Sequence, residues 1–274
     1  MKQRPSFPAR LDRSSNLTRA MAGVGDRKAE HQGGRPRPTA GLADGERWPQ
    51  LPVARLHALE SVAVRGNMVR QLASQGVSDP QVLMAMGTVE RHRFVDSALR
   101  AQAYEDTSLP IGLGQTISKP GVVCRMVELL RNGREGKLGR VLEVGTGCGY
   151  QAAVLSLLAE EVYSIERLRG LHDKARDNLR HLRLANVHLL FGDGMAGFAK
   201  GAPYAGIIAA AGGNAVPQAW IDQLAVGGRL VAPVSMATGA AGQQALLVME
   251  KTALGVRQAV FKAVHFVPLK SGVA

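Results

Sequence analysis

Three glycines at alternate positions follow a short apolar run, and they constrain the fold of this chain more than any other feature. The segment reads Gly139-Arg140-Val141-Leu142-Glu143-Val144-Gly145-Thr146-Gly147-Cys148-Gly149-Tyr150. Residues 141–144 have strand character, and a helical apolar pattern begins at Gln151. A strand, a tight glycine loop and a helix N-terminus present backbone N–H groups and a positive dipole end to a ligand. The segment therefore predicts the first repeat of an α/β sheet, with a ligand site at the loop.

The glycine spacing separates two kinds of ligand. A dinucleotide-binding loop has the pattern G-x-G-x-x-G, whose second glycine lets a pyrophosphate approach. Here the third glycine comes one residue early, at Gly149, and Tyr150 follows it. A second strand, 162–166, ends in Glu166, the expected place for an acid that holds two ribose hydroxyls. Glu166 would serve NAD equally well, so the spacing favours a ligand without phosphate. The pattern E-x-G-x-G-x-G resembles motif I of class I S-adenosylmethionine-dependent methyltransferases.

Length and cysteine content limit the class of protein. At 274 residues the chain can hold one large domain or two small ones. Its two cysteines, Cys124 and Cys148, make neither a disulfide framework nor a metal site, and we expect small buried residues in a reducing cytoplasm. No apolar run follows the first basic residues, and nowhere do eighteen uncharged apolar residues follow one another. We predict neither a signal peptide nor a membrane span.

The net charge of +12 is spread along the chain. Residues 1–60 carry eleven Lys and Arg against six Asp and Glu, and the other 214 residues carry 23 against 16. A spread excess favours a solvated basic surface, so we do not expect nucleic acid as a partner. Residues 1–52 are rich in Arg, Pro and Gly without an apolar period, which predicts a disordered extension. Residues 53–274 are then the folded domain.

Helix and strand patterns alternate through this domain. Helices are predicted at 53–75, from Pro80 with Asp79 as N-cap, and at 122–130, 168–184 and 217–224. Further strands are predicted at 187–191, 205–211 and 229–234, and an antiparallel pair at 244–251 and 259–267. Residues 104–120 are too polar and too broken by Gly and Pro for a core element, and we expect a loop over the ligand face. The predicted fold is α/β, with a mostly parallel Rossmann-like sheet, helices on both faces and N-terminal helices.

A specific resemblance lies in the segment before the helix at 122–130. It reads Leu109-Pro110-Ile111-Gly112-x-Gly114-Gln115-Thr116-Ile117-Ser118-x-Pro120 and resembles the signature of the protein-L-isoaspartate O-methyltransferase family. Other matching pieces are Arg93-Phe94-Val95, Gly192-Asp193-Gly194, residues 227–234 and Phe266-Val267-Pro268-Leu269. The similarity covers about residue 56 to the end. The Gln-Thr-Ile-Ser segment is more specific than the glycines, because other methyltransferases lack it.

The resemblance implies an activity and a site. The implied reaction is methyl transfer from S-adenosylmethionine (SAM) to the free α-carboxylate of isoaspartyl residues in damaged proteins and peptides, leaving S-adenosylhomocysteine and starting repair through a succinimide. The implied active-site residue is Ser118, and the implied substrate-binding residues are Gln115, Thr116, Ile117, Val267, Pro268 and Leu269. The implied cofactor-binding residues are Glu143, Gly145, Thr146, Gly147, Gly149, Tyr150, Glu166, Asp193 and Gly194. We expect a monomer without a metal.

Two of these residues have a structural alternative. Either Ser118 or Lys119 would cap the helix that starts at Pro120, which is a structural role for Ser118 as well supported as the functional one. The structural alternative for Asp193 is a turn residue. In class I methyltransferases an acid at the position of Asp193 accepts a hydrogen bond from the exocyclic amine of adenine. A carboxylate nucleophile with a pKa near 4 is ionised at neutral pH and needs no general base. A neutral hydroxyl such as that of Ser118 orients this oxygen without neutralising it, as Lys or Arg would.

The residues after the strand predicted at 205–211 distinguish rival functions. RNA base methylation usually uses Asn/Asp-Pro-Pro-aromatic there, or a Pro-Cys nucleophile, and neither is present. Metal-dependent O-methylation needs acids for Mg²⁺, which Gly212-Gly213-Asn214 does not offer. The family often has Thr-Ala-Ala where this chain has Ala209-Ala210-Ala211. This departure keeps open a catalytically silent methyltransferase fold that binds a protein partner.

Overall fold

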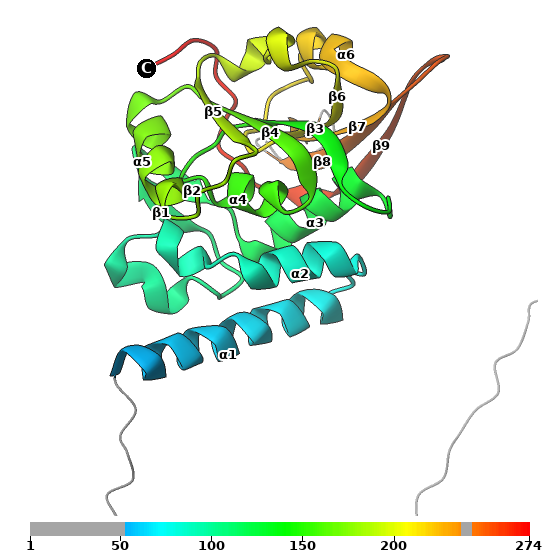
Figure 1. The fold of residues 1–274 in the computed structure, drawn as a ribbon. Helices are drawn as coiled ribbons and strands as arrows, with labels where there is room; N and C mark the ends of the chain where they lie inside the picture. Colours follow the sequence, from blue (N-terminus) through cyan, green and yellow to red (C-terminus); the bar gives the residue numbers. More distant parts are fainter. Residues whose placement is uncertain (1–52, 237–242) are drawn as a thin grey trace, which may run out of the picture. The chain divides into compact units, whose positions relative to one another are not determined.

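A seven-stranded sheet organises residues 53–236 and 243–274, the part of the chain that the computed structural model describes (Figure 1). The strand order is β5-β4-β3-β6-β7-β8-β9. The pairs from β5 to β7 are parallel, and β8 runs antiparallel to both β7 and β9. The strands are β3 (Leu138–Val144), β4 (Ala159–Glu166), β5 (Val187–Phe191), β6 (Tyr204–Ala209), β7 (Leu224–Ser235), β8 (Gln244–Thr252) and β9 (Gly255–Val264). The predicted fold class is confirmed, whereas the predicted extension at 1–52 lies outside the described residues.

The strand order reverses direction at β3. From β3 the chain proceeds to β4 and β5 on one side, and it then returns to place β6 on the other side of β3. In open α/β sheets a crevice forms at such a switch point, outside the carboxyl ends of the strands. The glycine loop follows β3 directly, so the topology places it at this crevice.

Helices cover both faces of the sheet (Figure 1). They are α1 (Val53–Ser74), α2 (Pro80–Thr88), α3 (Pro120–Arg131), α4 (Tyr150–Ser156), α5 (Arg169–Arg180) and α6 (Gln218–Gln223). Asp79 caps α2 as predicted, since its side chain accepts hydrogen bonds from the backbone N–H groups of Gln81 and Val82. In α1 only part of the predicted apolar pattern faces the core: Met68 and Leu72 are buried, whereas Val62 and Val64 are exposed.

Alternate residues of β3 face two separate apolar cores. Val141 packs with residues of α1 to α5, and Leu142 and Val144 pack on the other face with Trp220 of α6. Trp220 is buried, and its indole N–H donates a 2.8 Å hydrogen bond to the carbonyl oxygen of Gly194. A central parallel strand that is buried on both sides fixes the position of the loop that follows it.

Residues 109–117 form a β-hairpin, where the sequence predicted a loop outside the core. Its strands are β1 (Leu109–Gly112) and β2 (Gln115–Ile117), which pair antiparallel. The prediction is wrong because the side chains of Leu109, Ile111 and Ile117 are buried. Two adjacent residues with positive φ, Leu113 and Gly114, make the turn between the strands.

Some predicted boundaries shift in the structure. The helix expected at 168–184 ends at Arg180, and Arg183 follows with a left-handed φ of 48°. The strand predicted at 205–211 is β6, which ends at Ala209, and β7 begins earlier than predicted, at Leu224.

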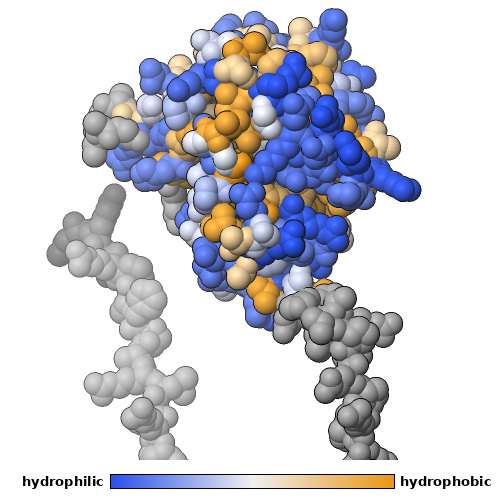
Figure 2. Space-filling view, turned by 90° about the vertical axis from the view of Figure 1, so that its left-hand side faces the viewer, coloured by the Kyte–Doolittle hydropathy of each residue, from blue (hydrophilic) through white to orange (hydrophobic). Residues whose placement is uncertain are grey.

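Figure 2 shows the side of the molecule on which α5 lies, where a band of apolar residues borders a strongly hydrophilic area. In the described part of the chain, no helix is both long and apolar enough to span a membrane.

Candidate active site

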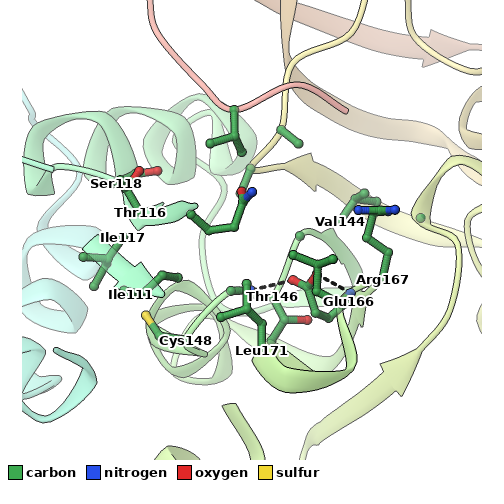
Figure 3. Close-up of a pocket in the computed structure, with 18 of the residues that line it drawn as sticks. Ile111, Thr116, Ile117, Ser118, Val144, Thr146, Cys148, Glu166, Arg167 and Leu171 are labelled. Atoms are coloured by element: carbon green, nitrogen blue, oxygen red, sulfur yellow. Dashed lines mark hydrogen bonds between the residues drawn. The ribbon is translucent and has the colours of Figure 1, made fainter. Parts of the chain in front are cut away.

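A cavity of about 480 Å³ lies at the carboxyl ends of β3, β4 and β6 (Figure 3). Its volume is within the range of small-molecule sites. Most of its lining comes from five segments: the β1–β2 hairpin with Ser118, the glycine loop with the start of α4, the end of β4 with the start of α5, the residues after β6, and residues 267–270. Val123 of α3 and Gly194 after β5 complete it. Figure 3 shows Thr116 and Ser118 on one side of this cavity and Glu166 and Arg167 on the other.

The three glycines of the loop all have left-handed backbones. Their φ angles are 93° at Gly145, 58° at Gly147 and 90° at Gly149, a region that side chains disfavour. Gly145 and Gly147 line the cavity, together with Thr146 between them. Gly149 does not line it: a Cβ atom at Gly149 would lie 3.0 Å from Cδ1 of Leu179 on α5. The third glycine therefore serves the close packing of α4 against α5.

Glu166 joins the end of β4 to the glycine loop. Its Oε2 accepts a 2.9 Å hydrogen bond from the N–H of Gly147, and its Oε1 accepts one of 3.0 Å from the N–H of Leu168. Glu166 is only 5% exposed and lines the cavity. Each carboxylate oxygen has a second lone pair for a ligand hydroxyl. Because a carboxylate already takes the loop N–H of Gly147, the loop is unfavourable for a pyrophosphate and suited to a nucleoside without phosphate.

Glu143 lies beneath the loop and does not line the cavity. It is fully buried, and the hydroxyl of Ser164 donates a hydrogen bond to its Oε2. The hydroxyl oxygens of Ser164 and Thr146 are 2.6 Å apart, so Thr146 donates to Ser164 in this chain of hydrogen bonds. Burial raises the pKa of Glu143 to about 8. Glu143 is thus linked to the cavity only through Ser164 and Thr146, and its contact with a cofactor stays a prediction.

Tyr150 begins α4 and is among the residues that line the cavity, and its ring packs into the core. The ring meets Phe94 edge-on at 5.5 Å between centroids, and the hydroxyl lies 3.7 Å from Sδ of Met86. The guanidinium of Arg91 lies 4.9 Å from the centre of the same ring. Tyr150 is 1% exposed, so its ring leaves the cavity open and anchors the loop to the N-terminal helices.

Asp193 and Gly194 follow β5 and differ in their placement. Gly194 lines the cavity, and a Cβ atom there would lie 2.5 Å from Cγ1 of Val144. Asp193 does not line the cavity. Its Oδ1 accepts from the N–H of Met195 at 2.8 Å, and its Oδ2 accepts from the N–H of Gly272 at 2.7 Å. Asp193 thus acts as the turn residue of the alternative interpretation, and its contact with adenine stays a prediction.

The predicted substrate-binding residues all line the cavity, opposite the end of β4. They are Gln115, Thr116, Ile117, Val267, Pro268 and Leu269, and Ser118 lies among them. The N-cap of α3 is Lys119, without a side-chain hydrogen bond to the helix, so Ser118 does not cap it. Two hydrogen bonds with Gly212 hold the C-terminal segment in place: the N–H of Gly212 donates to the oxygen of Val267 at 2.9 Å, and its oxygen accepts from the N–H of Leu269 at 2.7 Å.

Several lining residues were not predicted from the sequence. They are Leu113, Val144, Cys148, Gln151, Ile165, Arg167, Leu168, Leu171, Ala210, Ala211 and Lys270, among others. Leu168 and Leu171 belong to an amphipathic helical pattern, which gives core residues and cavity residues the same spacing. Leu113 is the unspecified position within the family signature. Among the described residues, no three His, Cys, Asp or Glu side chains gather where they could hold a metal ion.

The fold and this cavity together define a class of protein. The sheet has a switch point at β3, and the N–H of Gly147 in the glycine loop donates to Glu166 of the next strand. The cavity lies beside this loop and this acid. These features define a Rossmann-like nucleoside-binding fold of the class I methyltransferase type. The family model described as protein-L-isoaspartate(D-aspartate) O-methyltransferase (PCMT) matches residues 63–274. The chain belongs to this family.

Curated relatives named protein-L-isoaspartate O-methyltransferase are similar over almost the whole chain. One from Leptothrix cholodnii is 50% identical over 275 residues, covering 99% of this chain and 96% of the relative. One from Methylibium petroleiphilum is 52% identical over 272 residues, covering 98% and 96%.

Solved structures agree with the fold. A structure named protein-L-isoaspartate O-methyltransferase has a TM-score of 0.68 at 27% identity, and the match covers 77% of this chain and 67% of that one. A Plasmodium falciparum protein of the PCMT type, solved in complex with S-adenosyl-L-homocysteine, has a TM-score of 0.65 at 22% identity. That match covers 75% of this chain and 98% of the other, and it bears on the fold alone.

Proposed function

We propose that this protein transfers a methyl group from SAM to the free α-carboxylate of isoaspartyl residues in damaged proteins and peptides. The observation that carries the proposal is the placement of Ser118 and Glu166 on opposite sides of one cavity, in a member of the PCMT family. One side then holds the nucleoside and the other the carboxylate. The free, buried cysteines Cys124 and Cys148 support a reducing compartment such as the cytoplasm as its location.

The cofactor half of the cavity fits a sulfonium nucleoside. When bound, SAM supplies an activated methyl group to an attacking oxygen. Glu166 would hold the ribose hydroxyls through its remaining lone pairs, and Gly145 and Gly147 leave room for the ligand against the loop. Leu168 and Leu171 provide apolar surface beside Glu166 for the base. The carboxylate on the loop favours a cationic or neutral ligand over a phosphorylated one.

The substrate half positions an oxygen that is already charged. The Ser118 hydroxyl would donate to one oxygen of the substrate carboxylate and hold the other toward the cofactor half. Ile117, Val267 and Leu269 cover this side with apolar surface and limit water. Correct placement of two reactants can lower a barrier by about 7–11 kcal/mol. The methyl ester then closes to a succinimide without further catalysis, as the neighbouring backbone amide nitrogen displaces methanol, and water reopens part of the succinimide to normal aspartate.

The proposal is tested by counting methyl groups on two matched peptides. The full chain is incubated with methyl-labelled SAM and an isoaspartyl peptide or its aspartyl twin, and we expect label on the first only. Losing one hydrogen bond to a charged group costs about 1.5–3 kcal/mol, so Ser118→Ala lowers kcat/KM about 10- to 100-fold. SAM affinity by calorimetry stays unchanged, and Ser74→Ala at the end of α1 is the matched control.

Three results would contradict the proposal. They are equal labelling of both peptides, full activity of Ser118→Ala, and failure of the unaltered chain to bind SAM. The last result is the one expected for a catalytically silent scaffold.

A further inference from the structure

The tip of the β1–β2 hairpin has a backbone conformation that its residue type disfavours. Leu113 has a φ of 52°, followed by Gly114 at 69°. Two-residue hairpin turns with positive φ favour Asn, Asp or Gly at the first position, and a bulky residue there is strained. Leu113 is also 62% exposed. Neither turn preference nor core burial explains a leucine at this position, and strain of this kind is often retained at functional sites.

The side chain of Leu113 reaches across to the first turn of α5. A Cβ atom placed on Gly170 would lie 3.0 Å from Cδ1 of Leu113, so the leucine occupies the space that a side chain at 170 would fill. Glycine is a poor helix residue, and the approach of Leu113 accounts for its presence in α5. Leu113 lines the cavity, as do Leu168 and Leu171 around Gly170. The hairpin tip therefore meets α5 at the wall of the cavity.

A second contact holds the hairpin to the same helix. Nζ of Lys174 donates a 2.9 Å hydrogen bond to the carbonyl oxygen of Ile111, and it pairs with Asp96 at 3.1 Å. Ile111 lies over the glycine loop, where a Cβ atom on Gly147 would be 3.3 Å from its Cδ1. The hairpin is thus attached to α5 at its side and rests on the loop below. The contact at the tip, in contrast, consists of the exposed side chain of Leu113 against Gly170.

We propose that the hairpin tip is the gate for the cofactor and that Leu113 is the residue that closes it. SAM enters, and S-adenosylhomocysteine leaves, when Leu113 lifts off Gly170. The peptide reaches the cavity from the other side, past Ser118 and residues 267–269. Leu113 is a positioning residue in this account, because it holds the mouth closed over the half of the cavity that contains Glu166. The inference rests on the proposed binding of SAM beside Glu166.

The test measures how fast bound cofactor leaves the full-length protein. A complex with methyl-labelled SAM is chased with excess unlabelled SAM, and retained label is followed on filters. We expect Leu113→Ala and Gly170→Ala each to release SAM about tenfold faster, the second because its methyl group pushes the leucine away. The double variant releases SAM no faster than either single one, since both changes break one contact. Leu254→Ala, a fully exposed leucine between β8 and β9, leaves the rate unchanged.

Two comparisons separate a gate from a merely structural role. Alanine is a better helix residue than glycine, so Gly170→Ala would stabilise α5 and slow the release of SAM if the contact were merely structural. If Leu113 is the gate, the same variant releases SAM faster. Leu113→Gly removes the backbone strain, so its unfolding temperature without ligand stays equal or rises while release becomes faster. Unchanged release in the variants, or effects that multiply in the double variant, would overturn the gate alone. Failure of the unaltered protein to bind SAM would overturn both the gate and the proposed function.

Discussion

Asp79 and Arg131 form a buried ion pair that joins the start of α2 to the end of α3. Nε of Arg131 lies 2.9 Å from Oδ2 of Asp79, and their side chains are 1% and 7% exposed. The guanidinium also donates to the carbonyl oxygens of Arg134 and Gly136 and to the side chain of Gln81. All three guanidinium nitrogens thus donate hydrogen bonds at the point where the N-terminal helices meet the sheet domain.

Removing one partner of this pair should be costly. Arg131→Ala leaves the Asp79 carboxylate buried without its counter-charge, and we expect a loss of about 3–5 kcal/mol in the free energy of unfolding. Urea unfolding followed by circular dichroism measures this. Arg180→Ala breaks an exposed pair with Asp177 and should cost about 0–1 kcal/mol. Equal losses in the two variants would show that burial of the Asp79–Arg131 pair has no effect.

Glu143 should make stability depend on pH. Its pKa is raised by burial to about 8, against about 4.3 in an unfolded chain, so between these values the folded state holds a proton that the unfolded state has lost. Stability therefore falls as pH rises through this window, with a slope that approaches about 1.4 kcal/mol per pH unit. Glu143→Gln removes this component. Unfolding free energies at several pH values should diverge between the two proteins, whereas exposed Glu105→Gln should run parallel to the unaltered chain.

Glu166 should control cofactor affinity. Glu166→Ala removes the acceptor for the N–H groups of Gly147 and Leu168, together with the proposed ribose contacts. Each hydrogen bond to a charged group contributes about 1.5–3 kcal/mol, so we expect the Kd for SAM to rise about 10- to 100-fold. Calorimetry measures this Kd. Glu160→Ala, an exposed change on the same strand, is the control, and the same Kd in both variants would remove Glu166 from the site.

Gly149 should be sensitive to a single added methyl group. Gly149→Ala forces a side chain into a left-handed backbone and against Leu179 at 3.0 Å, so strain and overpacking add to about 2–4 kcal/mol. Gly133 has a φ of 69° with nothing within 4 Å of an added Cβ, so Gly133→Ala meets strain alone and should cost about 1 kcal/mol. Thermal unfolding of both variants separates the two effects. Similar shifts would mean that Leu179 moves aside freely.

The glycine loop and Glu166 could be predicted because their geometry is local or follows from a sheet rule. Glycines permit the left-handed backbones that a tight turn between a strand and a helix needs, and an acid at the end of a neighbouring parallel strand must lie at the same edge. The resemblance supplied Ser118 and residues 267–269, which no spacing pattern joins. Their shared cavity depends on the bridge between Gly212 and Pro268, a pairing between distant segments.

The hairpin and the contact between Asp193 and Gly272 could not be predicted, for related reasons. Leu109 and Ile111 alternate as strand residues do, but Pro110, Gly112 and Gly114 obscure so short a pattern. Oδ2 of Asp193 accepts a hydrogen bond from the N–H of Gly272, and Leu113 lies against Gly170. The two residues of each pair are far apart in the sequence. Contacts of this kind depend on tertiary packing, and no periodic pattern in a single sequence predicts them.

The hydrogen bond from Trp220 to Gly194 provides an optical reporter of the cavity. The chain has two tryptophans, Trp48 and Trp220, and the carbonyl that accepts from the indole belongs to a residue that lines the site. Replacing Trp48 by phenylalanine leaves one indole, shielded from solvent and bonded to the cavity wall. We expect its emission spectrum to change when a ligand fills the cavity, which gives a readout without a dye or an isotope.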